Sequence, residues 1–250
     1  MNAAEYRRMF SVENRHWWYV ALHEVVISLV ATEATARGPL QIFDAGCGTG
    51  RLAELLAPYG AVSGCDAAAA AIAFCRQRGL HAMEEISLQR VTLPANHFDV
   101  ITCIDVLYHR NIDDDVAILE KLRAALKPGG LLIIHLVAGP SLYSSHDVAV
   151  HSRERYTRAQ LQERLARAGL VIERLTYRLT FLLPLIATWR WLSRKGLERV
   201  KGEEVVSDVT TPPPLLNAAL LTLMRSENWL LRHVDLPGGS SLLAICRREP

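Results

Sequence analysis

The chain has 250 residues, of which 50% are hydrophobic and 22% are charged, and its formal net charge is +2. This length and composition predict a globular protein with one large domain and a sizeable core. The near-neutral charge gives no electrostatic reason to expect a nucleic-acid partner. The five cysteines form no C-x-x-C pair, so we expect no zinc knuckle, no redox dithiol and no iron–sulfur cluster, and we predict reduced thiols in a cytoplasmic protein.

The first part of the chain alternates between strand and helix patterns. Residues 1–36 are predicted to be helical, and Gly38-Pro39 ends that pattern. A short apolar strand then leads to Asp44, and a glycine-rich turn precedes the next helix. The elements expected up to residue 137 are strands over 40–43, 61–65, 98–104 and 131–137, and helices over 51–57, 67–77 and 116–126.

Strands that alternate with helices predict an α/β protein, with a mostly parallel sheet and helices on both of its faces. The strand expected over 131–137 is apolar throughout. Continuous apolar strands of this kind fit a sheet that is buried on both sides.

The pattern is less regular after residue 137. An apolar segment over 179–199 is interrupted by Pro184 and Arg190, so it is too short to span a bilayer, but its side chains suit a membrane surface. We interpret this segment as the start of an insertion before the last strand. The other elements expected in this part are a helix over 158–168, a strand over 170–178, a helix over 215–231 and a strand over 241–246.

The run Asp44-Ala45-Gly46-Cys47-Gly48-Thr49-Gly50 lies between the first strand and the helix that follows it. Glycines let the backbone turn tightly and approach a ligand closely, and open α/β sheets bind ligands at this carboxyl end of the strands. A dinucleotide-binding loop reads G-x-G-x-x-G, whereas here the third glycine comes one residue early and Arg51 fills the last position. Asp44 beside the loop suits a cationic ligand and would repel a pyrophosphate.

Asp66 follows the second predicted strand, sixteen residues after Gly50. A carboxylate at this place can accept hydrogen bonds from both hydroxyls of a ribose. Taken alone, the glycine run can be an ordinary turn, and Asp66 can be an aspartate that caps the following helix. Their order within one strand–helix–strand unit favours a cofactor that contains a nucleoside.

Three motifs resemble those of class I S-adenosylmethionine (SAM)-dependent methyltransferases, over about residues 38–137. Asp44–Gly50 is similar to motif I of that family, and Leu126-Lys127-Pro128-Gly129-Gly130 resembles the turn before its fifth strand. Leu93–Val100, followed by Asp105-Val106-Leu107-Tyr108-His109, resembles a block of its small-molecule subgroup. The resemblance implies a Rossmann-like, seven-stranded sheet and SAM as the cofactor, with S-adenosylhomocysteine as the product.

Segments outside this core resemble one bacterial subfamily that begins with an E-x-x-H-W-W motif. The matching segments are Glu13–Tyr19, Ser144–Asp147, His151–Tyr156 and Leu236–Leu242. This likeness implies a single methyltransferase domain over 1–250. Its expected parts are an N-terminal helical cap (1–37), a SAM-binding core (38–137), an acceptor-side region (138–178), an apolar helical insertion (179–235) and a last strand (236–250).

The resemblance assigns cofactor contacts by position. The loop glycines would face the methionine part of SAM, with Asp44 near its ammonium group and Asp105 on the far side, while Asp66 would hold the ribose. Relatives carry an acidic residue for the adenine where this chain has Gln89 and Arg90, which is a departure from the pattern. The predicted cofactor-binding residues are Asp44, Gly46, Cys47, Gly48, Gly50, Asp66, Ala67, Gln89, Arg90, Asp105 and Tyr19.

Methyl transfer from a sulfonium requires alignment of the reactants, and a base helps where the nucleophile carries a proton. We predict His109, which follows the fourth strand, as that base. A loop histidine bonded to backbone is the alternative for His109. Tyr108, which stands where relatives carry Glu, is predicted to orient the acceptor or to stabilise the sulfonium with its ring face.

A polar cluster after the fifth strand is the predicted acceptor site. Ordinary polar packing is an alternative for this cluster, and it is favoured over a metal site. Trp17 is predicted to form part of a lid or to anchor the first helix in the core. The predicted acceptor-binding residues are Trp17, Tyr143, His146, Asp147, His151, Arg155 and Tyr156.

We therefore expect a SAM-dependent methyltransferase that acts on a small-molecule or lipid-like acceptor, with peripheral membrane contact as an open prediction. Asp105–Tyr108 lacks the Asp/Asn-Pro-Pro-aromatic motif, which disfavours amine methylation of DNA bases. Two other functions stay open. One is a SAM-fold partner or regulatory protein without transferase activity, and the other is a nicotinamide oxidoreductase, which Asp44 and Arg51 disfavour.

Overall fold

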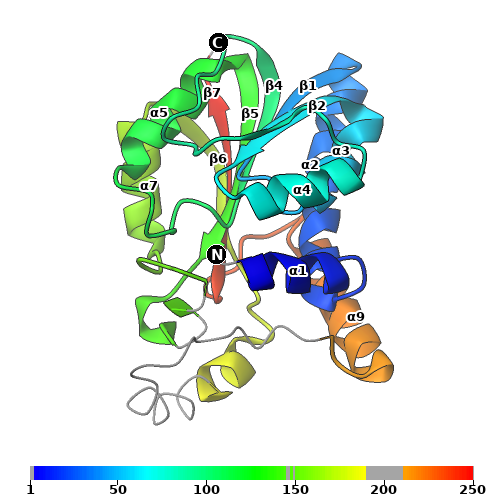
Figure 1. The fold of residues 1–250 in the computed structure, drawn as a ribbon. Helices are drawn as coiled ribbons and strands as arrows, with labels where there is room; N and C mark the ends of the chain where they lie inside the picture. The colour runs from blue at the N-terminus through cyan, green and yellow to red at the C-terminus, as the bar shows by residue number, and fades with distance from the viewer. Residues whose placement is uncertain (1–2, 145–146, 149, 190–210, 250) are drawn as a thin grey trace.

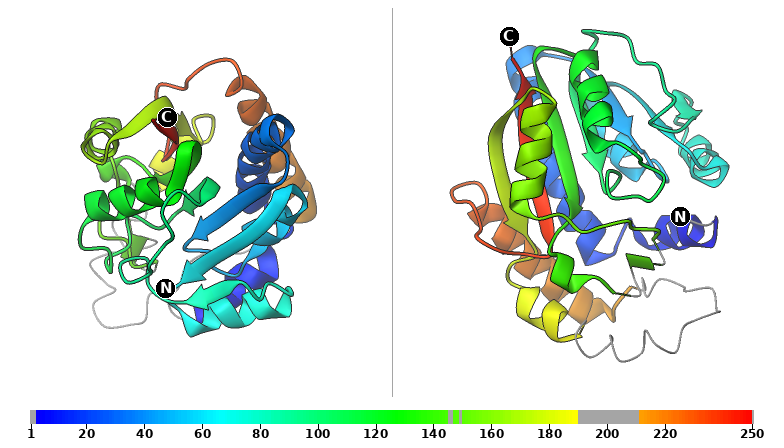
Figure 2. Two further views of the ribbon diagram at one scale, coloured as in Figure 1. Left: turned by 90° about the horizontal axis from the view of Figure 1, so that it is seen from above. Right: turned by 90° about the vertical axis from the view of Figure 1, so that its left-hand side faces the viewer.

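The computed structural model describes residues 3–144, 147–148, 150–189 and 211–249. In this part of the chain a seven-stranded sheet forms the centre of the molecule, with helices on both faces (Figures 1 and 2). The predicted Rossmann-like α/β fold with a mostly parallel sheet is confirmed. The strands are β1 (Leu40–Ala45), β2 (Gly60–Asp66), β3 (Met83–Glu85), β4 (Phe98–Ile104), β5 (Leu126–Val137), β6 (Leu170–Arg178) and β7 (Ser241–Arg248).

The strand order is β3-β2-β1-β4-β5-β7-β6, and β7 runs antiparallel to its neighbours β5 and β6. The chain proceeds outward from β1 on one side and from β4 on the other. The order therefore reverses between these two strands, and open α/β sheets bind ligands outside the carboxyl ends at such a point. The three-residue strand β3 was not predicted, since no apolar run marks it.

Helices cover both faces of the sheet. They are α1 (Ala3–Val12), α2 (Trp17–Arg37), α3 (Arg51–Leu56), α4 (Ala69–Gln77), α5 (Asp115–Ala125), α7 (Arg158–Arg167) and α9 (Pro214–Leu230), with 3₁₀ turns η1 (Ala57–Tyr59) and η2 (Pro140–Leu142). Apolar side chains of α2 and α3 form one core cluster with the sheet, and those of α5 and α7 form another. Helix α1 and the loops lie at the carboxyl ends of the parallel strands.

The helical region expected over residues 1–36 consists of two helices in the structure, α1 and α2. Helix α2 begins where His16 Nδ1 accepts a hydrogen bond from the Trp18 amide at 3.3 Å. Leu22, Val26 and Val30 follow at helical spacing and are buried against the sheet. By length and composition α2 is apolar enough to cross a membrane, but this buried stripe indicates a core helix.

A buried polar cluster anchors the insertion between β6 and β7 to the core. Glu227 of α9 is fully buried and accepts hydrogen bonds from the amides of Leu179 at 2.7 Å and Phe181 at 3.1 Å. Arg178, at the end of β6, donates to Asn228 Oδ1 at 2.9 Å. Burial lowers the pKa of the Arg178 guanidinium to about 10, although the nearby charge of Glu227 acts to raise it. These contacts fix the direction in which the chain leaves the sheet.

We predict that Glu227→Ala lowers the free energy of unfolding by about 2–4 kcal/mol, because it leaves two buried amides without acceptors and removes the charge beside Arg178. Urea unfolding followed by circular dichroism measures this. Glu24→Ala is the matched control, since Glu24 pairs with Arg225 at the surface and contributes less than about 1 kcal/mol. Equal effects of the two variants would contradict the prediction.

Candidate functional site

The glycine loop leaves the carboxyl end of β1 and is fixed by backbone hydrogen bonds. The amides of Gly46 and Cys47 both donate to the Cys65 carbonyl of β2 at 2.9 Å. Gly46 has a φ of 82°, and a Cβ at this position would lie 2.3 Å from Val106 Cγ2. A side chain is therefore excluded here, and the loop lies directly against the segment that follows β4.

Asp66, the last residue of β2, joins three parts of the chain. Its Oδ2 accepts a hydrogen bond from the Gly48 amide at 3.0 Å, and its Oδ1 accepts from the Ala68 amide at 2.9 Å and from the Tyr6 hydroxyl at 3.1 Å. Burial raises the pKa of Asp66, while these three hydrogen bonds favour its charged form. The carboxylate thus ties together the glycine loop, the start of α4 and helix α1.

Helix α1 lies across the glycine loop (Figure 1). Its Met9 Cε is 2.8 Å from the position that a Cβ at Gly48 would take. Phe10 stacks on Phe74 of α4 with ring centroids 4.4 Å apart, and the Arg78 guanidinium lies 4.6 Å from the Phe10 centroid. The N-terminal cap is therefore closed over the loop in this structure.

Glu13, between α1 and α2, is buried and paired. Thr49 Oγ1 of the glycine loop donates to its two oxygens at 2.6 and 2.7 Å, and Arg78 Nη2 lies 2.8 Å from its Oε1. Burial raises the pKa of Glu13, and the contacts with Thr49 and Arg78 act against that rise. Sequence reasoning assigned no role to Glu13, although it is the first residue of the E-x-x-H-W-W motif.

Asp44 is buried beneath the glycine loop. Thr102 Oγ1 of β4 donates to its Oδ1 at 2.7 Å. Burial raises the pKa of Asp44 to about 6, the hydrogen bond from Thr102 lowers it, and the neighbouring charge of Asp66 raises it further. Two carboxylates from adjacent strands thus flank the loop, and their charges oppose each other unless a cation lies between them.

Asp105, directly after β4, pairs with a histidine that the sequence analysis did not single out. Asp105 has a φ of 59°, and both of its carboxylate oxygens lie 3.1 Å from His135 Nδ1 of β5. His135 is fully buried, and its Nε2 has no hydrogen-bond partner among the described residues. No motif marks this histidine, because it lies within an otherwise apolar strand.

The residues predicted to hold the adenine lie in exposed or already paired positions. Ala67 is exposed beside Asp66. Gln89 Nε2 donates to Asp113 Oδ2 at 2.8 Å, and Arg90 is exposed. The hydrogen bond to Asp113 fixes the orientation of the Gln89 amide. An adenine contact by the Gln89 carbonyl oxygen stays a prediction.

Two further predicted cofactor residues are Cys47, which belongs to the glycine loop, and Tyr19 of helix α2. Burial raises the pKa of Tyr19, and the nearby charges of Glu13 and Asp105 raise it further. Cys47 Sγ is 3.8 Å from Cys75 Sγ, and the hydrogen bond between the two thiols together with burial raises the Cys47 pKa. Cys47 is therefore an uncharged thiol of the glycine loop that packs against Cys75.

His109 lies in the turn after β4, where the Asn111 amide donates to its Nδ1 at 3.2 Å. Burial lowers the pKa of His109 to about 4, with further contributions from His151 and Arg110. These observations favour the loop histidine bonded to backbone over the predicted general base. Tyr108 is buried, and burial raises the pKa of its hydroxyl well above its usual value.

The predicted acceptor cluster is largely paired within itself. Arg155 Nε lies 2.7 Å from Asp147 Oδ1, and both side chains are buried. Tyr156 is fully buried and donates its hydroxyl to Asp115. This burial favours ordinary polar packing over the acceptor contacts predicted for these three residues. In the part of the chain that the structure describes, no group of three or more His, Cys, Asp or Glu side chains is arranged to hold a metal ion.

The remaining acceptor candidates are dispersed. The Tyr143 hydroxyl donates to the Ser152 carbonyl at 3.0 Å, and the rings of His151 and His109 lie 5.7 Å apart. His146 lies outside the described residues. Acceptor contacts by Tyr143, His146 and His151 therefore stay predictions.

The two adjacent tryptophans of α2 point to different neighbours. The Trp17 amide donates to Asn217 Oδ1 of α9 at 3.0 Å, and its side chain packs against the apolar cluster of Ala21, Leu179, Leu182 and Met224, which favours a core anchor over a lid. Trp18 packs toward the sheet, with its ring 6.0 Å from that of His135. Helix α2 thus connects the insertion with the pair formed by Asp105 and His135.

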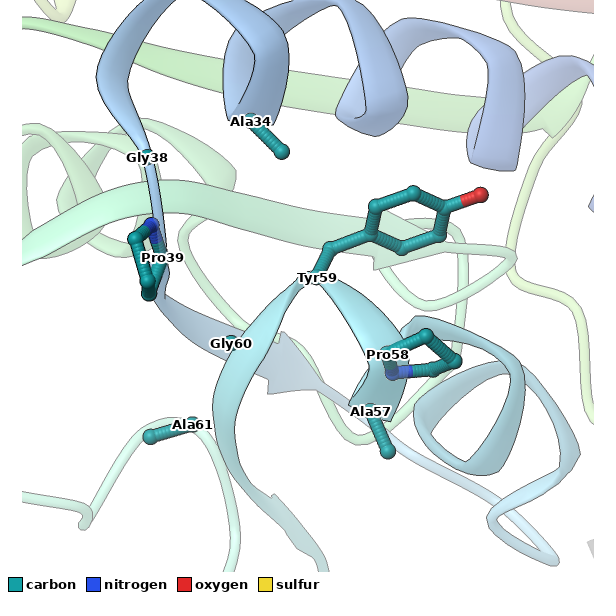
Figure 3. Close-up of a pocket in the computed structure, with 8 residues that line it drawn as sticks. All are labelled: Ala34, Gly38, Pro39, Ala57, Pro58, Tyr59, Gly60 and Ala61. Atoms are coloured by element: carbon teal, nitrogen blue, oxygen red, sulfur yellow. The ribbon is translucent and has the colours of Figure 1, made fainter.

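A surface pocket of about 550 Å³ lies at the other end of the sheet. Figure 3 shows that the Tyr59 ring lies near Ala34 of α2 in this pocket. The pocket adjoins the amino ends of β1 and β2, whereas open α/β sheets bind ligands at the carboxyl ends. Its lining has no ionisable side chain apart from Tyr59, so we assign it no function.

Comparison with known proteins matches residues 42–130 to the family described as "Methyltransferase domain". The chain is 31% identical over 145 residues to the ubiquinone biosynthesis O-methyltransferase of Histophilus somni (strain 2336). This match covers 49% of the present chain and 59% of that protein, so the chain spans little more than half the length of this curated relative. The narrower E-x-x-H-W-W subfamily stays a prediction.

Two solved structures show the same fold. A putative sarcosine dimethylglycine methyltransferase from Galdieria sulphuraria aligns with a TM-score of 0.58 at 17% identity, over 92% of this chain and 86% of that one. Phosphoethanolamine N-methyltransferase 2 of Haemonchus contortus, solved with S-adenosyl-L-methionine, aligns with a TM-score of 0.53 at 16% identity, over 89% and 53%. Residues 42–130 are therefore similar to a methyltransferase domain, and the chain has the Rossmann-like fold of these two solved structures.

Proposed function

We propose that this protein transfers the methyl group of SAM to a small-molecule acceptor. The observation that carries the proposal is the pair of carboxylates formed by buried Asp44 and partly buried Asp66, which flank a glycine loop at the carboxyl ends of adjacent strands. SAM carries an ammonium group and a ribose with two hydroxyls, and these are suitable partners for such carboxylates. Gly46 and Gly48 carry no side chains, and a glycine backbone permits the close approach that the rest of the ligand requires.

Asp66 can hold a ribose only if it releases one of its present hydrogen bonds. A carboxylate offers about four acceptor positions, and Asp66 uses three of them, for Gly48, Ala68 and Tyr6. Two ribose hydroxyls require two positions. The amides of Gly48 and Ala68 belong to the framework of the loop, so Tyr6 is the donor that a ribose would replace.

The cofactor supplies an electrophilic methyl group on a positively charged sulfur, so the residues of the chain mainly align the reactants and exclude water. The glycine loop sets the position of the ligand through its fixed backbone. Helix α1 covers that position, and the contact of Glu13 with Thr49 and Arg78 holds the cap closed.

The acceptor is proposed to be a hydroxyl-bearing small molecule of lipid-like character. The relative from Histophilus somni is named as an O-methyltransferase of ubiquinone biosynthesis. The described part of the insertion exposes Phe181, Leu185 and Trp189 by 42%, 66% and 65%. These side chains suit an apolar acceptor or a peripheral contact with a membrane surface. A cytoplasmic location is part of the proposal.

A SAM-fold partner protein without transferase activity is the second candidate. The observation that favours it is the pairing of the predicted acceptor cluster, in which Asp147 and Arg155 are buried against each other. Binding of the cofactor product without methyl transfer to any hydroxyl-bearing acceptor would support this candidate.

We predict that the protein binds S-adenosylhomocysteine with micromolar affinity and that Asp66→Ala weakens binding by at least about 100-fold, because two charge-assisted hydrogen bonds are lost. Isothermal titration calorimetry measures both affinities. Asp235→Ala is the control, since Asp235 is exposed and pairs with Arg174. A wild-type protein that does not bind the product would refute the cofactor assignment, and binding of NAD instead would favour an oxidoreductase.

We predict that Tyr6→Phe tightens the binding of S-adenosylhomocysteine by about 2–10-fold, because the ribose no longer displaces a hydrogen bond with a net value of about 0.5–1.5 kcal/mol. Calorimetry under the same conditions measures the change. Tyr59→Phe, at the opposite end of the sheet, is the matched control and is expected to leave the affinity unchanged. Unchanged or weaker binding by Tyr6→Phe would show that Tyr6 does not compete with the ribose.

We predict opposite effects of Asp44→Asn on stability and on binding. The pKa of Asp44 is about 6 in the folded protein, above its ordinary value of 3.8, so ionisation lowers folded stability increasingly as the pH rises from about 4 through 6. Asparagine keeps an acceptor for Thr102 without this charge. The variant is therefore expected to be more stable than the wild type by about 1–3 kcal/mol near pH 7.5, with no difference near pH 4.

The same Asp44→Asn variant is expected to bind S-adenosylhomocysteine more weakly, because the ligand's ammonium group loses its counter-charge. Denaturant unfolding at the two pH values and calorimetry near pH 7.5 measure the two effects. A variant that is less stable than the wild type near pH 7.5 would contradict the role of the buried charge.

A further inference from the structure

Fully buried His135 and partly buried Asp105 form a carboxylate–imidazole pair that the proposed function leaves unused. Both oxygens of Asp105 lie 3.1 Å from His135 Nδ1. A carboxylate can only accept, so the proton of the neutral imidazole lies on Nδ1. The lone pair of His135 Nε2 is therefore left to accept a hydrogen bond.

That lone pair has no donor in the described part of the fold. Three buried side-chain nitrogens there lack hydrogen-bond partners, namely Arg123 Nε, Arg178 Nε and His135 Nε2. The two guanidinium nitrogens are donors, so His135 Nε2 is the acceptor of the three. Buried polar atoms in native proteins are nearly always hydrogen-bonded to protein or to ordered water, so this nitrogen is available to a donor that the described residues do not supply.

The pair lies on the β4 and β5 side of the glycine loop. The Asp105 amide donates to the His135 carbonyl at 2.8 Å, and the next residue, Val106, contacts Gly46. Asp66 lies on the other side, at the end of β2, and the strand order separates β2 from β5 by β1 and β4. A ligand with its ribose at Asp66 therefore extends across the loop toward Asp105 and His135.

Resting on the proposed function, we propose that His135 Nε2 accepts the proton of the acceptor's hydroxyl during methyl transfer, with Asp105 as its positioning residue. The hydroxyl oxygen forms a bond to the methyl carbon as its O–H bond breaks. The carbon–sulfur bond breaks with its electron pair left on sulfur, which yields S-adenosylhomocysteine. The proton ends on His135 Nε2, and the Asp105 carboxylate stabilises the resulting imidazolium.

Access to His135 depends on helix α2. The His135 side chain has no exposed surface, and the Trp18 ring stands 6.0 Å from it. The Asp105 side chain is 17% exposed and marks the accessible edge of the pair. Proton transfer to Nε2 therefore requires that the Trp18 side chain be displaced.

Nitrogen-15 NMR of histidine-labelled protein saturated with S-adenosylhomocysteine, with phenol as the hydroxyl probe, tests this proposal without turnover. We expect a protonated Nδ1 and an unprotonated Nε2 at His135, and a saturable shift of the Nε2 signal with phenol. The exposed His97 is the internal control and is expected to stay unmoved. If the product binds but phenol leaves Nε2 unmoved, or if the proton lies on Nε2, the proposal is overturned. Failure of the product to bind would overturn the proposed function instead.

The kinetic counterpart compares His135→Asn with the control His97→Asn, using labelled SAM and catechol as the acceptor. We expect His135→Asn to keep its affinity for S-adenosylhomocysteine within about threefold and to lose at least about 100-fold in kcat with little change in KM. His97→Asn is expected to match the wild type. An unchanged kcat in His135→Asn would overturn the role of His135 as proton acceptor, and so would a loss of affinity for S-adenosylhomocysteine as large as the loss in kcat. If the wild type methylates catechol too slowly to measure, the NMR titration decides between the two outcomes.

Discussion

The Asp66 carboxylate is the group around which the site is built. It accepts hydrogen bonds from the Gly48 amide, the Ala68 amide and the Tyr6 hydroxyl, which belong to the glycine loop, the start of α4 and helix α1. A partly buried charge needs such donors, so none of the three segments can move away without leaving the carboxylate less well satisfied. The position of the cap over the loop follows from the same requirement, since Tyr6 completes the set.

Much of this arrangement follows from short-range signals in the sequence. Glycines in a turn after an apolar strand, and aspartates at the ends of two such strands, marked the loop, Asp44 and Asp66. The contacts that close the cap could not be predicted in this way. Tyr6 and Asp66 are 60 residues apart, and Glu13 and Arg78 are 65 residues apart. Their pairing depends on how α1 packs on α4, which no local pattern encodes.

The histidines show the other limit of sequence reasoning. His109 stands in a recognisable motif, but the turn that carries it engages its Nδ1 through the Asn111 amide. His135 stands in no motif, and its pairing with Asp105 arises because β4 and β5 place Ile104 opposite His135. The polar residues of the predicted acceptor cluster could also be recognised in the sequence. The sequence does not show whether Arg155 binds a ligand or pairs with Asp147, because that depends on how deeply the two side chains are buried.

The insertion between β6 and β7 begins and ends at paired positions of the sheet, since Arg178 lies opposite Ser241. The entropy of closing a loop grows only with the logarithm of its length, so doubling the segment would cost about 0.6 kcal/mol. Strand pairing holds both ends, and the glycine loop lies at β1 and β2, away from this junction. Chains that share this core can therefore exchange one insertion for another at little thermodynamic cost. Under the proposed function, the range of acceptors can then diverge while the half of the sheet that carries the glycine loop stays the same.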